Sequence, residues 1–263
     1  VLDNFGHNLT KGQSKILKEI NNDINSEQRM FRLLQGDVGS GKTILALITA
    51  ANIIEINYQV AFMAPTEILA QQHYKLAIKL FKNSNINIEL FTGKTDLNKK
   101  KDILSGLQKG KINLLFGTHA LFQNKIKFLN LGFIIIDEQH KFGVNQRIKL
   151  AKKGGKNCDL LLISATPIPR TMMLSFFGDM DISRLNEKPK YRKNIITLIK
   201  PEKKLDEILP LLKKEISLER QIFWICPLID ISSNLNYTSA KKKFEQVDKL
   251  FPKQVGLIHG GID

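Results

Sequence analysis

The amino-acid sequence predicts an α/β fold in which helices flank a parallel β-sheet. From Phe31 onward, short apolar runs alternate with longer amphipathic stretches, as they do when crossover helices join parallel strands. The run FIII, residues 133–136, has no polar face, which is typical of a strand covered on both sides. A glycine-rich segment, residues 36–43, lies between a strand-like run and a helix-like run. In such a sheet, the residues that follow the strands form the ligand-binding edge.

The expected strands are short, and the expected helices between them differ in their apolar faces. Residues 43–56 are apolar on nearly every side, which predicts a buried central helix. Residues 66–81 carry one apolar stripe, through Leu69, Leu76 and Leu80, and should lie on a face of the sheet. The strands are expected at FRLLQG (31–36), VAFMAP (60–65), INIELFTG (86–93), INLLFGT (112–118), FIIIDE (133–138) and LLLISAT (160–166).

A break in this pattern divides the chain into two parts. Residues 186–194, NEKPKYRKN, combine charge with a proline, as linkers do. We therefore expect a first domain over residues 1–187 and the start of a second over residues 188–263. The second part again alternates, and we expect it to be an incomplete α/β unit within a longer protein. Its strand-like runs are residues 195–200, 221–229 and 254–259, with a helix-like run at 202–216.

The composition favours an acidic partner in a reducing compartment. Of the 263 residues, 40 are Lys or Arg and 25 are Asp or Glu, which gives a net charge of +15. Such a charge suits phosphate-rich partners, although a merely solvated lysine-rich surface would have the same composition. Cys158 and Cys226 lie far apart without metal-ligand spacing, so we expect a cytoplasmic protein without a disulfide framework. No apolar run reaches the roughly 18 residues of a membrane span.

The segment GDVGSGKT predicts a phosphate-binding loop. It fits the pattern G-x-x-x-x-G-K-[ST] in the required context, after a strand and before a helix. Glycines let backbone N–H groups face phosphate oxygens, and the helix N-terminus adds its dipole. Lys42 would neutralise the β- and γ-phosphates of ATP, and Thr43 would give its hydroxyl to Mg²⁺. The expected nucleotide-binding residues are Gly36, Asp37, Val38, Gly39, Ser40, Gly41, Lys42 and Thr43.

Two adjacent carboxylates end the strand FIIID, where a bound nucleotide would need a metal. Asp137 is placed to hold the Mg²⁺ shell, as an acidic residue on a neighbouring strand does in P-loop enzymes. Glu138 would orient or deprotonate the water that attacks the γ-phosphate. Two unpaired carboxylates would repel each other, and a divalent cation removes that repulsion. The alternative is that these are ordinary surface acids at a strand end, and the presence of the phosphate-binding loop makes that interpretation less favoured.

Other polar segments occur in a fixed order around the phosphate-binding loop. They are LTKGQ (9–13), APTEILAQQH (64–73), FTGK (91–94), GTHALF (117–122), DEQHKFGVNQR (137–147), SATPIPRT (164–171), WICPLI (224–229) and GLIHG (256–260). Taken together, the four-residue segment DEQH (137–140) and these motifs resemble the bacterial RecG family of superfamily 2 ATP-dependent DNA helicases, and the resemblance covers essentially all 263 residues.

This resemblance implies a RecA-like P-loop NTPase lobe followed by an incomplete second RecA-like lobe. It implies a monomer that uses ATP and Mg²⁺ to act on branched DNA in recombination and repair. Gln13 would read adenine, and His140 would act beside the acidic pair or serve only a structural purpose. Ser164 and Thr166 would couple the state of the nucleotide to the DNA site.

The DNA assignment also has a physical basis, because the polar segments after the strands should meet at one edge of the sheet. Thr66 and Thr118 each begin a helix-like run, where free backbone N–H groups suit DNA phosphates. Gly93 and Lys94 add a flexible loop with a cation. Alternatively, the two threonines are simple helix caps, which is the usual role of an N-terminal threonine.

The sequence also departs from the family. Members of that family carry a wedge domain that grips branched DNA, and later motor motifs that include an arginine reaching the γ-phosphate; we expect both to lie outside residues 1–263. Such an arginine is worth about 10³ to 10⁵ in turnover in related phosphoryl transfers. A catalytically defective ATP- and DNA-binding module therefore stays open as an alternative to a working helicase. A relative of the transcription-repair coupling translocase is a second alternative, since it shares similar segments.

Overall fold

The computed structural model describes residues 2–138, 158–166, 180–187, 195–201, 204, 207–229 and 239–261. Contacts between Cα atoms separate the chain into two compact units, residues 1–193 and residues 194–263. Within the described residues, no helix is long and apolar enough to cross a membrane.

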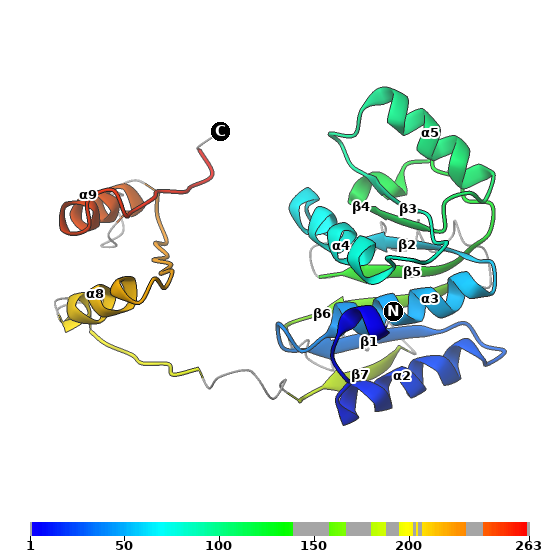
Figure 1. The fold of residues 1–263 in the computed structure, drawn as a ribbon, viewed down its shortest axis with the longest axis horizontal. Helices are drawn as coiled ribbons and strands as arrows, with labels where there is room; N and C mark the ends of the chain where they lie inside the picture. The colour runs from blue at the N-terminus through cyan, green and yellow to red at the C-terminus, as the bar shows by residue number, and fades with distance from the viewer. Residues whose placement is uncertain are drawn as a thin grey trace. The chain divides into compact units, whose positions relative to one another are not determined.

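The first unit is built on a seven-stranded sheet in which every described pairing is parallel (Figure 1). The predicted α/β fold with a parallel sheet is confirmed. From one edge to the other the strands follow the order β3-β4-β2-β5-β6-β1-β7. Their bounds are β1 (Phe31–Gly36), β2 (Gln59–Met63), β3 (Ile88–Phe91), β4 (Leu114–Gly117), β5 (Leu131–Asp137), β6 (Asp159–Ser164) and β7 (Asp181–Leu185).

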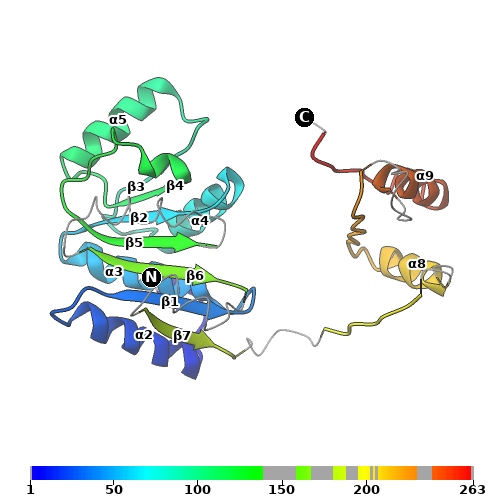
Figure 2. The ribbon, with the colours of Figure 1, turned by 180° about the vertical axis from the view of Figure 1, so that it is seen from behind.

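Helices lie on both faces of this sheet, as the alternating pattern predicts, and Figure 2 shows α3 (Lys42–Glu55) behind the strands. Side chains of α2 (Lys11–Ile24), α3 and α4 (Glu67–Leu80) belong to one apolar cluster. Ile103 and Leu107 of α5 (Leu97–Gln108) belong to a second cluster. The described first unit is completed by α1 (Leu2–Phe5) and the short 3₁₀ helix η1 (His119–Phe122).

The predicted central helix is α3, which is buried almost all the way round. Its side chains Leu45 and Leu47 are 0% exposed, although they point to different sides of the helix. By contrast, α4 has one buried stripe that includes Ala77 and Leu80, with exposed residues such as Ile68 opposite. The helix that follows the phosphate-binding segment is therefore fixed within the core, so its N-terminus is held in place relative to β1.

The carboxyl ends of the parallel strands meet at one edge of the sheet. β1 ends at Gly36, β5 at Asp137 and β6 at Ser164, and these three strands lie side by side in the order β5-β6-β1. Further along the sheet, β4 ends at Gly117, where a Cβ atom would approach the backbone oxygen of Phe91 to 2.6 Å. Only glycine allows β3 and β4 to come together at that point.

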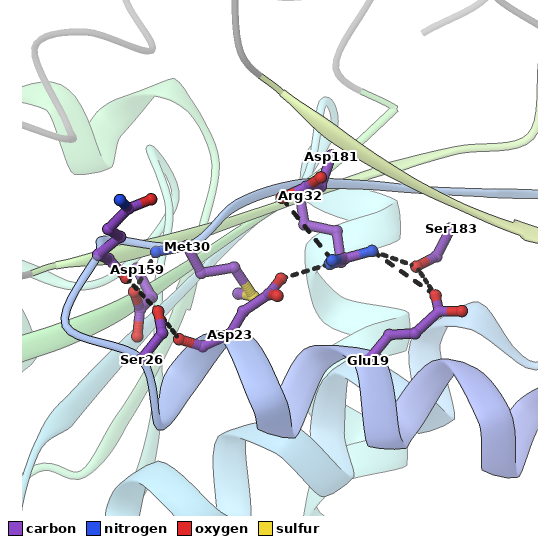
Figure 3. Close-up of polar contacts among 9 residues, drawn as sticks. Glu19, Asp23, Ser26, Met30, Arg32, Asp159, Asp181 and Ser183 are labelled. Atoms are coloured by element: carbon purple, nitrogen blue, oxygen red, sulfur yellow. Dashed lines mark hydrogen bonds and ion pairs between the residues drawn. The ribbon is translucent and has the colours of Figure 1, made fainter.

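At the opposite edge, a polar network ties α2 to the sheet (Figure 3). Arg32 of β1 donates to Asp23 over 2.6 Å and to the Ser183 hydroxyl over 2.7 Å, and Ser183 donates to Glu19 over 2.6 Å. The Arg32 guanidinium is buried, and its partners lie on two elements, α2 and β7. A cavity of about 380 Å³ near Asp159 also lies at this edge and includes no residue of the phosphate-binding segment.

In the second unit, the described helices are α8 (Leu209–Ser217) and α9 (Ala240–Leu250). The prediction of strands at residues 195–200, 221–229 and 254–259 is wrong for the described residues, because no strand is found in them. Phe223 is 85% exposed and Ile225 is 89% exposed. A strand forms only when a neighbouring strand completes a ladder of backbone hydrogen bonds, and no such ladder is found for these runs among the described residues. The carbonyl oxygens of Leu228 and Ile229 instead accept the N–H groups of Ala240 and Lys241 at the start of α9.

Candidate functional site

The loop between β1 and α3 has the backbone that phosphate binding requires. Gly39 and Gly41 have φ values of +76° and +96°, a region that L side chains rarely adopt. Gly41 is the N-cap of α3, and none of the described side chains accepts a hydrogen bond at that cap. The first N–H groups of α3 are therefore open to an anion, and the helix dipole favours one there.

Lys42 is the first residue of α3, and its side chain reaches back to this loop and lends it a positive charge. Its ammonium group donates to the carbonyl oxygen of Gly36 over 2.7 Å and to that of Asp37 over 2.9 Å. Burial lowers the pKa of Lys42 from its ordinary value, and the carboxylates of Asp137, Glu138 and Asp37 act against that shift. The two acids predicted to work on the nucleotide thus lie within electrostatic range of the lysine.

Ser40 and Gln13 link the same loop to α2. The Gln13 side chain donates to the carbonyl oxygen of Ser40 over 2.8 Å, and its own oxygen accepts the N–H of Thr10 over 2.9 Å. Thr10 and Gln13 form a capping box at the start of α2. The Ser40 hydroxyl is buried and has no hydrogen-bond partner among the described residues. Such an orphan group, beside an uncapped helix and an ammonium, suits a loop that receives phosphate oxygens.

Asp137 lies at the end of β5 with its carboxylate held from two sides. Its Oδ1 accepts the N–H of Glu138 over 3.0 Å, and its Oδ2 lies 2.8 Å from Nε2 of His73 on α4. Only 8% of Asp137 is exposed. Glu138 has φ +48°, the left-handed region that costs a non-glycine residue energy. A strained residue directly after a buried carboxylate is typical of a functional site.

Ser164 and Thr166 form a compact turn at the end of β6. The Ser164 hydroxyl lies 3.1 Å from the Thr166 hydroxyl and accepts the N–H of Thr166 over 3.2 Å. Gln35, the residue before the phosphate-binding loop, donates to the carbonyl oxygen of Thr166 over 3.1 Å. The turn is therefore joined directly to the strand that carries the loop.

The residues predicted to contact DNA lie where β2, β3 and β4 end. Thr66 is exposed and caps α4 by accepting the N–H of Leu69 over 3.2 Å. Lys94 is exposed, and the N–H of Gly93 donates to Glu67 over 2.8 Å. Thr118 is only 3% exposed, and no described side chain caps the 3₁₀ helix that it precedes. The cap role of Thr66 leaves its DNA role a prediction.

One predicted site residue lies outside the described part of the chain, and three residues that contact predicted site residues were not predicted. His140, and with it Gln139, lies outside the described residues. Sequence reasoning also missed His73, Gln35 and Glu67, each of which contacts a predicted site residue. A signal existed for His73, because it lies seven residues after Thr66 and therefore on the same face of a helix. Gln35 and Glu67 act through contacts across the sheet edge, which no local pattern encodes.

Comparisons with known proteins agree with this geometry. The sequence profile of the DEAD/DEAH box helicase family matches residues 10–174. The ATP-dependent DNA helicase RecG of Aquifex aeolicus is 46% identical over 254 residues, which cover 96% of this chain and 32% of that protein. RecG of Bacillus subtilis is 44% identical, over 96% and 37%. This chain thus spans about a third of the length of these curated relatives.

Solved structures agree as well. A structure of RecG bound to a three-way DNA junction matches with a TM-score of 0.77 and 40% identity, over 92% of this chain and 31% of that one. The helicase Mss116p bound to single-stranded RNA and a nucleotide analogue matches with a TM-score of 0.57 and 20% identity, over 80% and 48%. The second likeness supports the fold alone. The resemblance to the RecG family that the motifs carry is confirmed.

Proposed function

The chain belongs to the DEAD/DEAH box helicase family, and on that premise we propose that it forms the ATP-binding lobe and adjoining segment of an ATP-dependent DNA helicase of RecG type. The observation that supports this most is the arrangement of Lys42, Asp137 and Glu138 around one loop. An uncapped helix, a buried ammonium and a carboxylate pair, of which Asp137 is buried and Glu138 is half-buried, meet where three neighbouring strands end. That combination suits a nucleoside triphosphate bound together with a divalent cation.

In this proposal the loop residues bind and orient the phosphates of ATP. The N–H groups of α3 and the Lys42 ammonium would hold the β- and γ-phosphates, once the ammonium exchanges its contacts with Gly36 and Asp37 for phosphate oxygens. The residues present also fit Mg²⁺, which takes oxygen ligands and usually combines one or two protein groups with phosphates and waters. Asp137 and Thr43 would hold it, and the cation would neutralise charge on the phosphates. Glu138 would orient the attacking water.

Gln13 would contribute indirectly as well as by reading adenine. Its amide is only 5% exposed and already donates to Ser40 of the loop. A nucleotide base that engages Gln13 would therefore also change what holds the loop. Ser164 and Thr166 would couple nucleotide state to DNA, supported by their contact with Gln35 directly before the loop.

We propose DNA as the partner, in a branched form such as the three-way junction seen with RecG. Thr66, Gly93, Lys94 and Thr118 would contact its backbone. Support comes from their place at the carboxyl ends of β2, β3 and β4, and from the net charge of +15. Phosphate contacts position a protein on DNA without reading its sequence, so these residues suit a protein that moves along it.

The test is ATP binding and hydrolysis by the 263-residue chain, with and without a three-way DNA junction. Lys42→Ala should abolish turnover and weaken binding of a fluorescent ATP analogue at least tenfold, while circular dichroism shows an unchanged fold. Lys18→Ala is the matched control, because Lys18 is an exposed lysine on α2. Undiminished binding and turnover in Lys42→Ala would contradict the assignment of the loop. Binding of ATP without turnover would favour a catalytically defective binding module.

A further inference from the structure

His73 contacts the carboxylate that is proposed to hold the metal, although no motif assigns it a task. It lies on α4, and its Nε2 atom is 2.8 Å from Oδ2 of Asp137. Both side chains are only 12% exposed. The imidazole packs against Phe62 of β2, with ring centroids 4.8 Å apart. The ring is therefore held in one orientation by packing, and that orientation directs a ring nitrogen at Asp137.

The chemistry of this contact fixes its direction. An ionised carboxylate has no proton to give and only accepts hydrogen bonds, so Nε2 of His73 must donate. The other oxygen, Oδ1, accepts the backbone N–H of Glu138 over 3.0 Å. Donors from two different elements thus fix the plane of the Asp137 carboxylate. Carboxylates that bind metals are commonly oriented by such hydrogen-bond partners, and loss of one partner costs about 10- to 100-fold in metal affinity or activity.

The same helix reaches the proposed DNA edge. Thr66 caps the N-terminus of α4, and Glu67 in its first turn accepts the N–H of Gly93 over 2.8 Å. His73 lies seven residues after Thr66, which is about two helical turns on the same face. One rigid element therefore carries two residues at the expected DNA contacts and a third on the expected metal-binding carboxylate.

We propose that His73 is a positioning residue for Asp137, and that α4 thereby connects the DNA edge to the metal site. This inference rests on the proposed function, since it concerns the same magnesium site. His73 donates its Nε2 hydrogen to Oδ2, which holds the carboxylate ready for Mg²⁺. A shift of α4 on binding DNA would move that donor and change how well Asp137 binds the cation.

Two substitutions separate this role from simple packing. His73→Phe keeps an aromatic ring against Phe62 but removes the donor. His73→Gln removes the ring but keeps an N–H that can reach Oδ2. A packing role predicts that Phe replaces His73 better than Gln does, whereas a positioning role predicts the reverse. Gln72→Ala is the control, because Gln72 is the exposed neighbour of His73 on the same helix.

The first measurement is metal affinity in the presence of saturating ADP, with Mn²⁺ as the probe and electron paramagnetic resonance as the readout. Mn²⁺ suits because it favours the same oxygen ligands as Mg²⁺. His73→Phe should weaken Mn²⁺ binding about 10- to 100-fold. His73→Gln should restore most of the affinity, and Gln72→Ala should match the wild type. Wild-type affinity in His73→Phe, in a chain that circular dichroism shows to be folded, would overturn the proposal.

The second measurement repeats the Mn²⁺ titration with a saturating three-way DNA junction, with saturation checked by fluorescence anisotropy. The wild-type chain should change its Mn²⁺ affinity on binding DNA, and His73→Phe, saturated with the same junction, should not. An unchanged affinity in the wild type, or the same change in His73→Phe, would overturn the connection through α4. If the wild-type chain bound neither nucleotide nor DNA, the proposed function itself would fail, and the two failures are thus distinguishable.

Discussion

Among the individual residues, Asp159 is a half-buried carboxyl group that a backbone N–H contacts. It begins β6, and its Oδ1 accepts the N–H of Met30 over 2.8 Å. Burial raises the pKa of Asp159 to about 6, although the Met30 N–H and the nearby Arg29 act against the shift. A carboxyl with a raised pKa in the folded state favours folding while it is protonated. Its contribution is complete below about pH 4 and is lost as the pH rises through about 6.

Asp159→Asn should therefore stabilise the protein at neutral pH. The amide keeps an oxygen that can accept from Met30 but cannot ionise. We expect a gain of about 1 kcal/mol at pH 8, reduced from the full value of the shift because the side chain is partly exposed. At pH 4 the variant and the wild type should melt alike. Thermal unfolding followed by circular dichroism between pH 4 and 8 measures this, and a difference independent of pH would contradict the assigned pKa.

The two cysteines should differ in reactivity. Cys158 is 0% exposed, and burial raises the pKa of its thiol to about 12, whereas Cys226 is partly exposed. Because the thiolate is the nucleophile, Cys158 should resist alkylation in the folded chain. Mass spectrometry after brief iodoacetamide treatment at pH 7.5 should find one modified thiol, and two after denaturation. Cys226→Ser should abolish the fast modification; a fast reaction that persists in it would mean that Cys158 is accessible.

At the scale of single residues, the sequence predicted those site residues that belong to a motif with a fixed local spacing. Lys42 and Asp137 belong to patterns that specify both residue type and position, and the structure places both at one sheet edge. The contact between His73 and Asp137 was not predicted, because the two residues are 64 positions apart and only the fold brings them together. The unpaired state of the Ser40 hydroxyl could not be predicted either, because it depends on how the described residues pack around the loop.

At the scale of elements, the Arg32 network joins α2 to β1 and β7 (Figure 3). Arg32 is 7% exposed, and its closest acidic partner is Asp23 at 2.6 Å, with Glu19 at 3.6 Å and Asp181 at 3.8 Å. Removing one partner of a buried charge costs more than the contact itself was worth, because the remaining charge stays buried without its acceptor.

Asp23→Ala should therefore destabilise the first unit by about 1–3 kcal/mol, a range limited by the acceptors that Arg32 keeps. Lys15→Ala is the control on the same helix. Lys15 is 79% exposed and lies 4.0 Å from Glu19, so its loss should change stability by less than about 0.5 kcal/mol. Urea unfolding followed by circular dichroism compares them, and equal effects of the two substitutions would mean that the Arg32 network is not buried in solution.

A comparison of the two units shows where an apolar sequence pattern predicts a strand correctly and where it does not. In the first unit, every predicted strand is found, because each apolar run has neighbours on the sheet that complete its hydrogen bonds. In the second unit, the run at 221–229 is also mostly apolar, but no strand pairs with it among the described residues. An apolar run therefore predicts where a strand can form, whereas pairing decides whether it does. The edge strand β7 (Asp181–Leu185) was not predicted, since its burial alternates and it is short.

At the scale of the whole molecule, the fold indicates where the net charge of +15 could act on a partner. Charge alone is equally consistent with a solvated surface and with a nucleic-acid partner. The parallel sheet adds that the ends of β2, β3 and β4 lie together, and Lys94 is exposed there. If DNA phosphates occupy this edge, binding releases condensed counterions, and affinity must fall as salt rises.

Lys94→Ala therefore tests whether DNA binding depends on net charge alone or on a cation at the loop after β3. For the wild type, the logarithm of the association constant for a three-way junction should fall linearly with the logarithm of salt concentration. Loss of one phosphate contact should reduce the slope by about 1. Lys18→Ala removes the same charge from an exposed site on α2 and should leave the slope unchanged. Fluorescence anisotropy between about 50 and 200 mM salt measures both slopes. If the two variants lowered the slope equally, net charge would govern DNA binding and the sheet edge would have no special part in it; a slope changed by Lys94→Ala alone would locate the DNA backbone at the loop after β3.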